Sequence, residues 1–135
     1  MSFDTVKQIM EEAGSGYLAT TDGDRAYVRP MGSPQWVGSE LWMATGLNSG
    51  KVAQIKKRNR VEFCIADKAW RFVRIAGTCS ISQAATDRQT FMDRVPVIKQ
   101  YFSGATDANY AVLRIKVETM QLVTPQGETS VQPPR

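Results

Sequence analysis

The sequence feature that most constrains the fold is a series of short segments in which every second residue is apolar. The alternation is clearest from Arg60 to Ala66. There Val61, Phe63 and Ile65 fall on one face of an extended chain, because successive side chains of a strand point to opposite sides. A chain built from several such segments buries one face of a sheet, so the sequence predicts a mainly β domain.

We predict six strands joined by hairpin-like links, with three short helices at the connections. The Asp22-Gly23 pair is a typical hairpin turn. Long strands with such links favour a closed antiparallel barrel. The expected strands are Gly16 to Thr21, Arg25 to Met31, Glu40 to Thr45, Arg60 to Ala66, Trp70 to Ser82 and Tyr110 to Val123, and the expected helices are Ser2 to Ala13, Ser49 to Lys57, and a third that Thr86 caps and Pro96 ends.

Three irregularities within the strands carry further expectations. Pro30 has no N–H to donate, which favours an edge strand, a bulge or the end of a strand. Gly77 indicates a bend or a close approach of another backbone. The apolar residues of the last strand change parity near Glu118-Thr119, and a β-bulge there would explain the change.

The length and charge bound the broad class of protein. The chain has 135 residues, enough for one domain with a real core; we expect that domain at 1–125 and a frayed, Pro-rich tail at 126–135. The net charge is +4, but the basic residues are scattered, and the single run of three, Lys56-Lys57-Arg58, suits a helix C-terminus. We therefore expect no nucleic-acid partner. No apolar run is long enough to span a bilayer and no signal peptide is evident, so the expected location is cytoplasmic.

The absence of histidine excludes much catalytic chemistry. There is no His in the chain, so a Ser-His or Cys-His nucleophile pair and a His-ligated haem are excluded. Cys64 and Cys79 have no metal-ligand partner at short spacing and are expected to be buried free thiols, so no metal site is predicted. Redox or transfer chemistry would have to come largely from a cofactor.

One local pattern is suited to holding a phosphate group. Asn48 and Ser49 precede the second helix, and Lys51 lies in its first turn. Free N–H groups and the helix dipole favour an anion at such a position. Arg29 on a preceding strand could add a second cation with a planar fork, and Gln54 lies one helical turn beyond Lys51. The alternatives are an ordinary helix cap, a solvent-facing strand arginine and a solvated glutamine.

Aromatic residues near this pattern indicate a ligand with a flat ring. Trp42 and Thr45 could line the ring and bond to it, although a tryptophan in a strand is also a common core residue. Trp70 and Arg74 share parity on the long strand and face away from its apolar side. Both residue types are enriched in subunit interfaces, and the alternative is an ordinary exposed strand face.

Taken in order, these motifs resemble the split-barrel flavoproteins related to pyridoxamine 5′-phosphate oxidase, particularly the short general-stress-protein type. The resemblance runs from about Ser2 to Val123. The matching segments are Gly16 to Thr20, Arg29-Pro30-Met31, Trp42-Met43-Ala44-Thr45, Ser49-x-Lys51 with Gln54-Ile55, Asn59 before Val61, and Trp70 through Arg74 to Gly77.

The resemblance implies a six-stranded antiparallel split barrel that forms a homodimer, with flavin mononucleotide (FMN) in the groove between subunits. It implies that Arg29, Ser49 and Lys51 hold the phosphate, with Pro30 and Met31 beside them in the same motif. By the same resemblance, Trp42, Met43 and Thr45 border the isoalloxazine with Gln54 nearby, while Trp70 and Arg74 approach from the outer face, from this chain or its partner.

The function implied is a flavin-dependent oxidoreductase that acts on an unidentified small molecule. The alternatives are a flavin-binding sensor or carrier without turnover, and a deazaflavin-dependent reductase. The chain departs from true pyridoxamine 5′-phosphate oxidases, which have a further basic residue where this chain has Gly32-Ser33-Pro34 and a C-terminal Arg-x-His motif that a chain without histidine lacks. Vitamin B6 is therefore not the expected substrate, and no catalytic residue is assigned.

Overall fold

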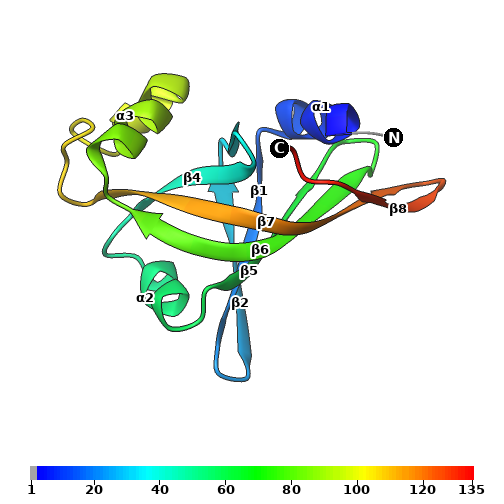
Figure 1. The fold of residues 1–135 in the computed structure, drawn as a ribbon, viewed down its shortest axis with the longest axis horizontal. Coiled ribbons are helices and arrows are strands. Elements are labelled where there is room, and N and C mark those ends of the chain that lie inside the picture. Colours follow the sequence, from blue (N-terminus) through cyan, green and yellow to red (C-terminus); the bar gives the residue numbers. More distant parts are fainter. Residues whose placement is uncertain (1–2) are drawn as a thin grey trace.

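The computed structural model describes residues 3–135, which form eight strands, three α-helices and one 3₁₀ turn (Figure 1). The elements follow in the order α1 (Phe3–Ala13), β1 (Ser15–Asp22), β2 (Arg25–Gly32), β3 (Gln35–Val37), β4 (Glu40–Gly46), α2 (Gly50–Lys57), β5 (Arg60–Ala66), β6 (Phe72–Ser82), α3 (Ala85–Arg94), η1 (Pro96–Gln100), β7 (Tyr110–Thr124) and β8 (Gly127–Val131).

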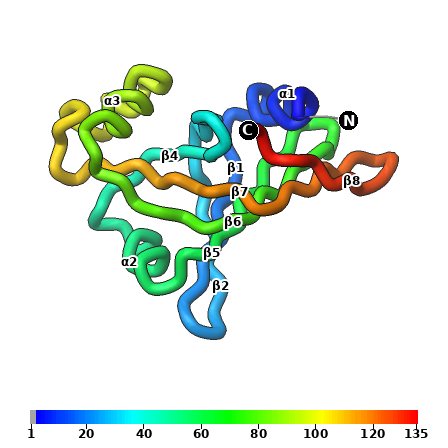
Figure 2. The backbone as a smooth tube through the Cα atoms, viewed as in Figure 1, coloured from blue at the N-terminus to red at the C-terminus, as the bar shows by residue number. Residues whose placement is uncertain are grey.

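The strands form one antiparallel sheet in the order β2-β1-β5-β6-β7-β4-β3, with β8 paired to β7. The sheet is strongly coiled, and the β1–β2 hairpin crosses the direction of β6 and β7 steeply (Figure 2). In the part of the chain that is described, the path ends at β2 and β3, which do not pair. The mainly β split barrel is thus confirmed, while the closed barrel expected from the strand pattern is wrong.

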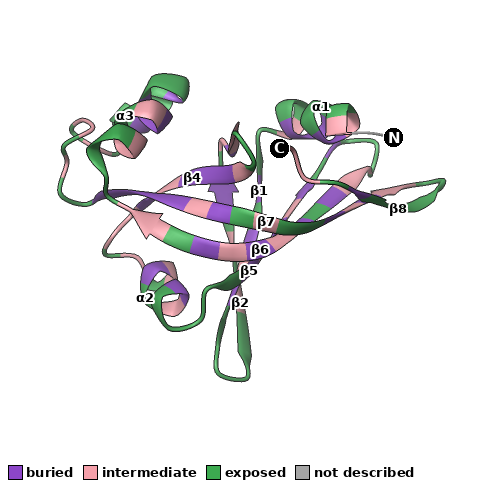
Figure 3. Cartoon of the chain, viewed as in Figure 1, coloured by how far each residue is buried: buried purple, intermediate pink, exposed green. Residues whose placement is uncertain are grey.

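Two hydrophobic clusters stabilise the molecule. The larger fills the barrel and receives the inward side chains of the strands together with the apolar face of α1. A smaller one lies between α3, η1 and the strands β4 and β7. Figure 3 marks the buried residues along these elements in purple. Leu18, Met43, Phe63, Ile75 and Leu113 are among the fully buried members of the larger cluster. The alternating burial along β5 and β6 is what the sequence pattern predicted.

The predicted irregularities of β6 and β7 are present. Ala76 pairs with Thr119 but Gly77 pairs with Val117, so Glu118 is the extra residue of a bulge. A side chain on Gly77 would collide with the carbonyl oxygen of Lys116. Gly77 therefore marks a close approach of two backbones, as predicted.

Several predicted boundaries on the N-terminal half need adjustment. β2 is an edge strand, which explains how Pro30 is accommodated. The first hairpin turns at Gly23-Asp24, one residue later than expected, because Asp22 still pairs with Arg25. The short strand β3 was not predicted, since it has only three residues and directly follows Pro34. The predicted capping role of Ser2 lies outside the described residues.

Two expectations about the later elements are wrong. α3 begins at Ala85, so Thr86 lies within the helix; the hydroxyl of Ser82 accepts the N–H of Ala84 just before it. Cys79 is buried as expected, but Cys64 is only half-buried because it lies on the outer face of β5.

The segment expected to be a frayed tail contains a strand. Gly127–Val131 forms β8 along the end of β7, and Val131 is buried against the barrel core. Gly127 has a φ of 135°, which permits the tight turn between the two strands. Among the residues described, no helix is both long and apolar enough to cross a membrane.

Candidate functional site

The guanidinium of Arg29 lies between β1 and α2. Its Nη1 donates to Oγ1 of Thr20 at 2.8 Å and to the carbonyl oxygen of Leu18 at 3.2 Å, and its Nη2 donates to Oε1 of Gln54 at 2.8 Å. The hydroxyl of Thr20 also donates to Oε1 of Gln54 at 2.6 Å. These bonds fix the arginine fork where the edge strand meets the helix.

The ammonium group of Lys51 lies in a second cluster at the start of the same helix. Its Nζ is 3.0 Å from Oγ1 of Thr45 and 3.3 Å from Oγ of Ser49, and the two hydroxyls are 3.3 Å apart. Thr45 comes from the end of β4 and is buried. The strand end and the helix start thus place two hydroxyls and an ammonium group together.

The N-terminus of α2 has the local geometry of an anion site. Ser49 is the N-cap residue in an extended conformation, but its side chain makes no capping hydrogen bond. The first turn contains no acidic residue, whereas Lys56 and Lys57 occupy the last turn. Lys51 in the first turn opposes the helix dipole, so its position costs stability unless an anion is present.

The charges of these two neighbouring clusters, which together we call the phosphate cluster, are unbalanced. Burial lowers the pKa of Arg29, and burial together with the nearby charge of Arg29 lowers the pKa of Lys51. Within residues 3–135, no carboxylate forms a salt bridge with either side chain. Two partly desolvated cations without a counter-ion form a site that an anionic ligand would stabilise.

A hollow of about 520 Å³ opens beside Lys51, and we call it the β4 hollow. This volume is in the range of small-molecule sites. Strand β4 and Lys51 form one side, and α3, η1 and the loop after η1 form the other. Its lining residues are Gly32, Ser33, Ala44, Thr45, Gly46, Lys51, Phe91, Val97, Ile98, Tyr101, Phe102 and Asn109.

The remaining predicted residues of β2 and β4 lie around this cluster without joining it. Met31 and Met43 are buried in the barrel core, and Pro30 is exposed next to Arg29. Trp42 is buried in the smaller hydrophobic cluster, where its Nε1 donates to Glu40 at 2.9 Å and the guanidinium carbon of Arg114 lies 5.0 Å from the ring centroid. The side chain of Trp42 therefore supports α3 and is absent from the lining of the β4 hollow.

Trp70 and Arg74 lie outside the phosphate cluster and the β4 hollow. Trp70 was expected in a strand, but it lies in the turn before β6 with a φ of 57°, and its side chain is 77% exposed. The carboxylate of Asp67 accepts the N–H groups of Ala69 and Arg71, which stabilises this turn. Arg74 is on the outer face of β6 and pairs with Glu62 at 2.7 Å. In Figure 1 the turn lies close to α1, at the other end of the barrel from α2.

The sequence reasoning missed two polar residues of the site. Thr20 is fully buried and holds both Arg29 and Gln54, and the signal for it is a hydroxyl residue on the same inward face as Leu18. Asn109 accepts the N–H groups of Leu47 and Asn48 through its backbone and side-chain oxygens. It lies 61 residues from Asn48, so no local pattern could have identified it.

A family model described as pyridoxamine 5′-phosphate oxidase matches residues 3–124. No curated protein was found to be similar to this chain.

Solved structures share the fold at low sequence identity. A NimC/NimA family protein from Clostridium acetobutylicum has a TM-score of 0.85 and 21% identity, covering 94% of this chain and 89% of its own. General stress protein 26 from Bacillus anthracis has a TM-score of 0.77 and 21% identity, over 88% and 91%. A pyridoxamine 5′-phosphate oxidase-related, FMN-binding protein from Nostoc punctiforme has a TM-score of 0.75 and 14% identity, over 96% of both chains.

Proposed function

This chain belongs to the pyridoxamine 5′-phosphate oxidase family, and from that premise we propose that it is an FMN-binding oxidoreductase. The observation that carries the proposal is the pair of partly buried cations, Arg29 and Lys51, without a carboxylate partner in the described chain. A phosphate monoester supplies the missing negative charge and accepts hydrogen bonds from both groups.

Each polar group of the cluster has a role in this proposal. Lys51 and the hydroxyls of Ser49 and Thr45 would bond the phosphate, together with the free N–H groups at the start of α2. Arg29 would bond it through guanidinium donors left over from its contacts with the protein, since five are available. Thr20 and Gln54 hold that guanidinium in place.

The β4 hollow would receive part of the ring system. Phe91, Ile98 and Phe102 give it an apolar wall, and Thr45 and Asn109 offer polar contacts. When bound, FMN supplies reversible hydride transfer, and the protein contributes binding, orientation and exclusion of water. Lys51 would also place positive charge near the cofactor.

We further propose that the protein is a homodimer whose interface completes the flavin site. The support is the outer face of the β1–β2 hairpin, where two large apolar side chains are exposed, Tyr17 at 58% and Val28 at 68%. Pairing places Pro30 and Cys64 opposite Tyr17 on the same face. A second copy on this face could bring its Trp70 and Arg74 toward the flavin, which the single chain does not do.

The first experiment is the visible absorbance spectrum of the purified protein, before and after incubation with FMN and desalting. Retained flavin bands support the cofactor proposal, and a colourless protein that retains no FMN contradicts it. Competition with a deazaflavin then identifies the preferred cofactor.

Turnover is tested by adding NADH or NADPH to the FMN-loaded protein without oxygen and following the loss of flavin absorbance. Reduction, followed by reoxidation with small-molecule acceptors, supports an oxidoreductase. If the protein holds FMN but no donor reduces it, a flavin sensor or carrier replaces the enzyme.

A further inference from the structure

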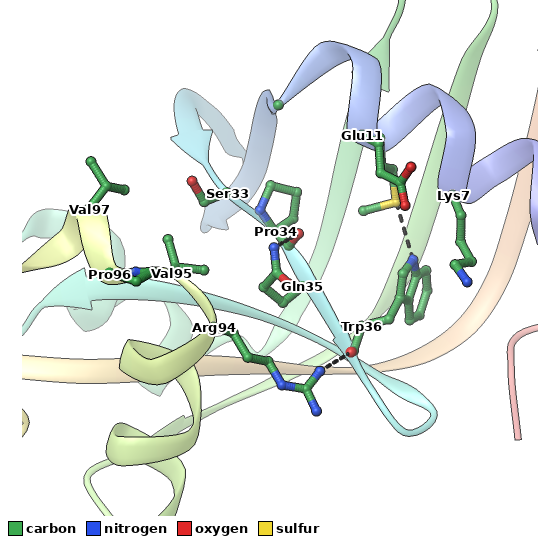
Figure 4. Close-up of a pocket in the computed structure, with 12 residues that line it drawn as sticks. Lys7, Glu11, Ser33, Pro34, Gln35, Trp36, Arg94, Val95, Pro96 and Val97 are labelled. Carbon is green, nitrogen blue, oxygen red and sulfur yellow. Dashed lines mark hydrogen bonds between the residues drawn. The ribbon is translucent and has the colours of Figure 1, made fainter.

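A second hollow of about 460 Å³ lies between α1, the segment entering β3, and the α3–η1 junction (Figure 4). We call it the α1 hollow. The charged and aromatic side chains of its lining are Lys7 and Glu11 from α1, Trp36 from β3 and Arg94 from α3. None of them belongs to the phosphate cluster.

The α1 hollow adjoins the β4 hollow. Ser33 and Val97 line both of them. Ser33 has a φ of 51°, and its N–H donates to the carbonyl oxygen of Gly14 at 2.9 Å. A non-glycine residue in this conformation is uncommon and tends to occur at binding sites. Because the two hollows share Ser33 and Val97, a ligand in the α1 hollow would reach the space next to the proposed flavin ring.

The α1 hollow carries an excess of positive charge. Among the residues described, neither Lys7 nor Arg94 forms a salt bridge, and Glu11 is the single acidic residue of the lining. Nη1 of Arg94 donates to the carbonyl oxygen of Trp36 at 2.8 Å, which holds the guanidinium at the edge of the hollow with further donors free (Figure 4). An anionic group would be attracted to this side.

Trp36 supplies a rigid aromatic surface. Its ring is half-buried and packs edge-on against Phe3, with centroids 5.1 Å apart. Its Nε1 donates to the sulfur of Met10 at 3.2 Å. A thioether is a weak acceptor, so a ligand oxygen would be a stronger partner for the same N–H.

We propose that the α1 hollow binds a small planar organic anion, such as an aromatic carboxylate, and that this is the substrate class of the flavin site. Lys7 and Arg94, which lie on either side of Trp36, attract the negative group (Figure 4). The planar part lies against Trp36, and the molecule extends past Ser33 toward the β4 hollow. The assignment as substrate rests on the proposed flavin function, whereas the binding of the anion does not.

The test is a titration of the full-length protein with benzoate, followed by NMR of the indole N–H groups. The chain has three tryptophans, and the Trp36→Phe variant identifies the Trp36 signal. Benzoate should shift that signal saturably, and neutral benzamide of the same shape should shift it far less. The titration is run with and without FMN.

Charge variants test the recognition itself. Lys7→Gln should weaken benzoate binding by roughly 3- to 10-fold, and Glu11→Gln should strengthen it by a similar factor, because one unit charge at close range in a solvated site is worth about this much. Lys56→Gln, at the far end of α2, is the matched control and should change nothing. Both lysines are exposed, so none of these variants is expected to affect folding.

Equal binding of benzoate and benzamide, or an unchanged affinity in Lys7→Gln, would overturn the anion site even if FMN is retained. Benzoate binding by a protein that fails to retain FMN would instead overturn the substrate assignment. The two failures are therefore distinguishable. Binding of benzoate to the FMN-loaded protein, with a change in the flavin absorbance, supports both.

Discussion

At the scale of single residues, the structure holds cations where they cost stability. Lys51 is partly desolvated, lies in the first turn of a helix and is close enough to Arg29 for its pKa to fall. Each of these conditions disfavours the charged form. Such a conflict between stability and charge is typical of residues kept for binding.

The first prediction concerns the stability of the protein without ligand. Without ligand at pH 7, the melting temperature of Lys51→Met should equal or exceed that of the parent, because a desolvated cation is removed. FMN should raise the melting temperature of the parent, and Lys51→Met should lose most of this rise. Thermal unfolding with and without FMN checks both. Lys56→Met is the control and should keep the full rise. A large destabilisation of Lys51→Met without ligand would contradict this account.

The pH dependence has a definite sign. The pKa of Lys51 is lower in the folded protein than its usual 10.5, so its unfavourable contribution is fully present below the folded pKa. It disappears as the pH rises from the folded pKa toward 10.5, because the unfolded chain then binds more protons. The difference in unfolding free energy between Lys51→Met and the parent should therefore shrink from pH 7 to pH 10.5. Denaturant titrations at several pH values measure it.

The local part of this site could be predicted from the sequence, and the rest could not. Ser49, Lys51 and Gln54 are close along the chain, so helix geometry alone places them in the first turns of α2. There Lys51 bonds Ser49, and Gln54 bonds Arg29. Thr20 and Asn109 join through strand pairing and a distant loop, which single-sequence patterns do not contain. Trp42 was expected beside the isoalloxazine ring. It packs in the smaller hydrophobic cluster instead, because residues of α3, which are distant in the sequence, lie against it.

At the scale of elements, the pairing of β6 with β7 organises the barrel. The extra residue Glu118 changes the parity of β7, so that Ile115 and Met120 both point into the core. The bulge was predictable because it leaves a trace in the apolar pattern. β3 and β8 were not predictable, since strands of three and five residues with mixed polarity leave no recognisable apolar pattern in the sequence.

The second prediction concerns the close approach at the bulge. Gly77→Ala should destabilise the protein by about 1–3 kcal/mol, because the new methyl group would overlap the backbone carbonyl of Lys116, which cannot rotate away. Gly104→Ala is the control, since nothing lies near the added atom. Urea unfolding measures the stability of both variants. If Gly77→Ala is as stable as Gly104→Ala, the two backbones can move apart at this point and the prediction is wrong.

The third prediction concerns the attachment of α3. Arg114 on β7 donates to Glu40 at 2.8 Å and to Asp87 of α3 at 2.9 Å. Arg114→Leu should destabilise the protein by about 1–2 kcal/mol, because two half-buried carboxylates lose their partner. Exchange of amide hydrogens in α3 should accelerate more than exchange in β5. Uniform acceleration in both elements would contradict a specific role for this contact.

The same contact predicts an effect of acid. Burial opposes ionisation of Glu40, but the hydrogen bonds from Arg114 and Trp42 outweigh it and lower the pKa of the carboxyl group. The stabilisation by Glu40 is therefore present above its usual pKa of 4.5 and is lost as the pH falls through the lower, folded value. Glu40→Gln should reduce this loss in denaturant titrations between pH 6 and pH 3.

At the scale of the whole molecule, the open barrel leaves an edge and an apolar outer face. Val28, on the strand that carries Arg29, and Tyr17, on the paired strand β1, are exposed on this face. Such a face rarely remains in contact with water. Because β2 carries Val28 on one face and Arg29 on the other, assembly on this strand would be linked to cofactor binding.

The fourth prediction tests this link. Val28→Asp should convert the proposed dimer to a monomer and weaken FMN binding, because it places a charge in the centre of the apolar face. Light scattering after size-exclusion chromatography gives the mass, and FMN titration gives the affinity. Val97→Asp, also half-exposed but on η1, should leave the mass unchanged. A parent protein that is monomeric at all concentrations would rule out the interface.

The central claim, that Arg29 and Lys51 form a phosphate site for FMN, is tested most directly by the dissociation constant of FMN for the double variant Arg29→Ala/Lys51→Ala. The quenching of flavin fluorescence measures it. We predict a loss of about 100-fold or more, because two charge-assisted groups are removed. The double variant Lys56→Ala/Lys57→Ala, which loses the same charge at the other end of α2, should bind FMN nearly as well as the parent. Equal affinity of the parent and Arg29→Ala/Lys51→Ala would contradict the assignment.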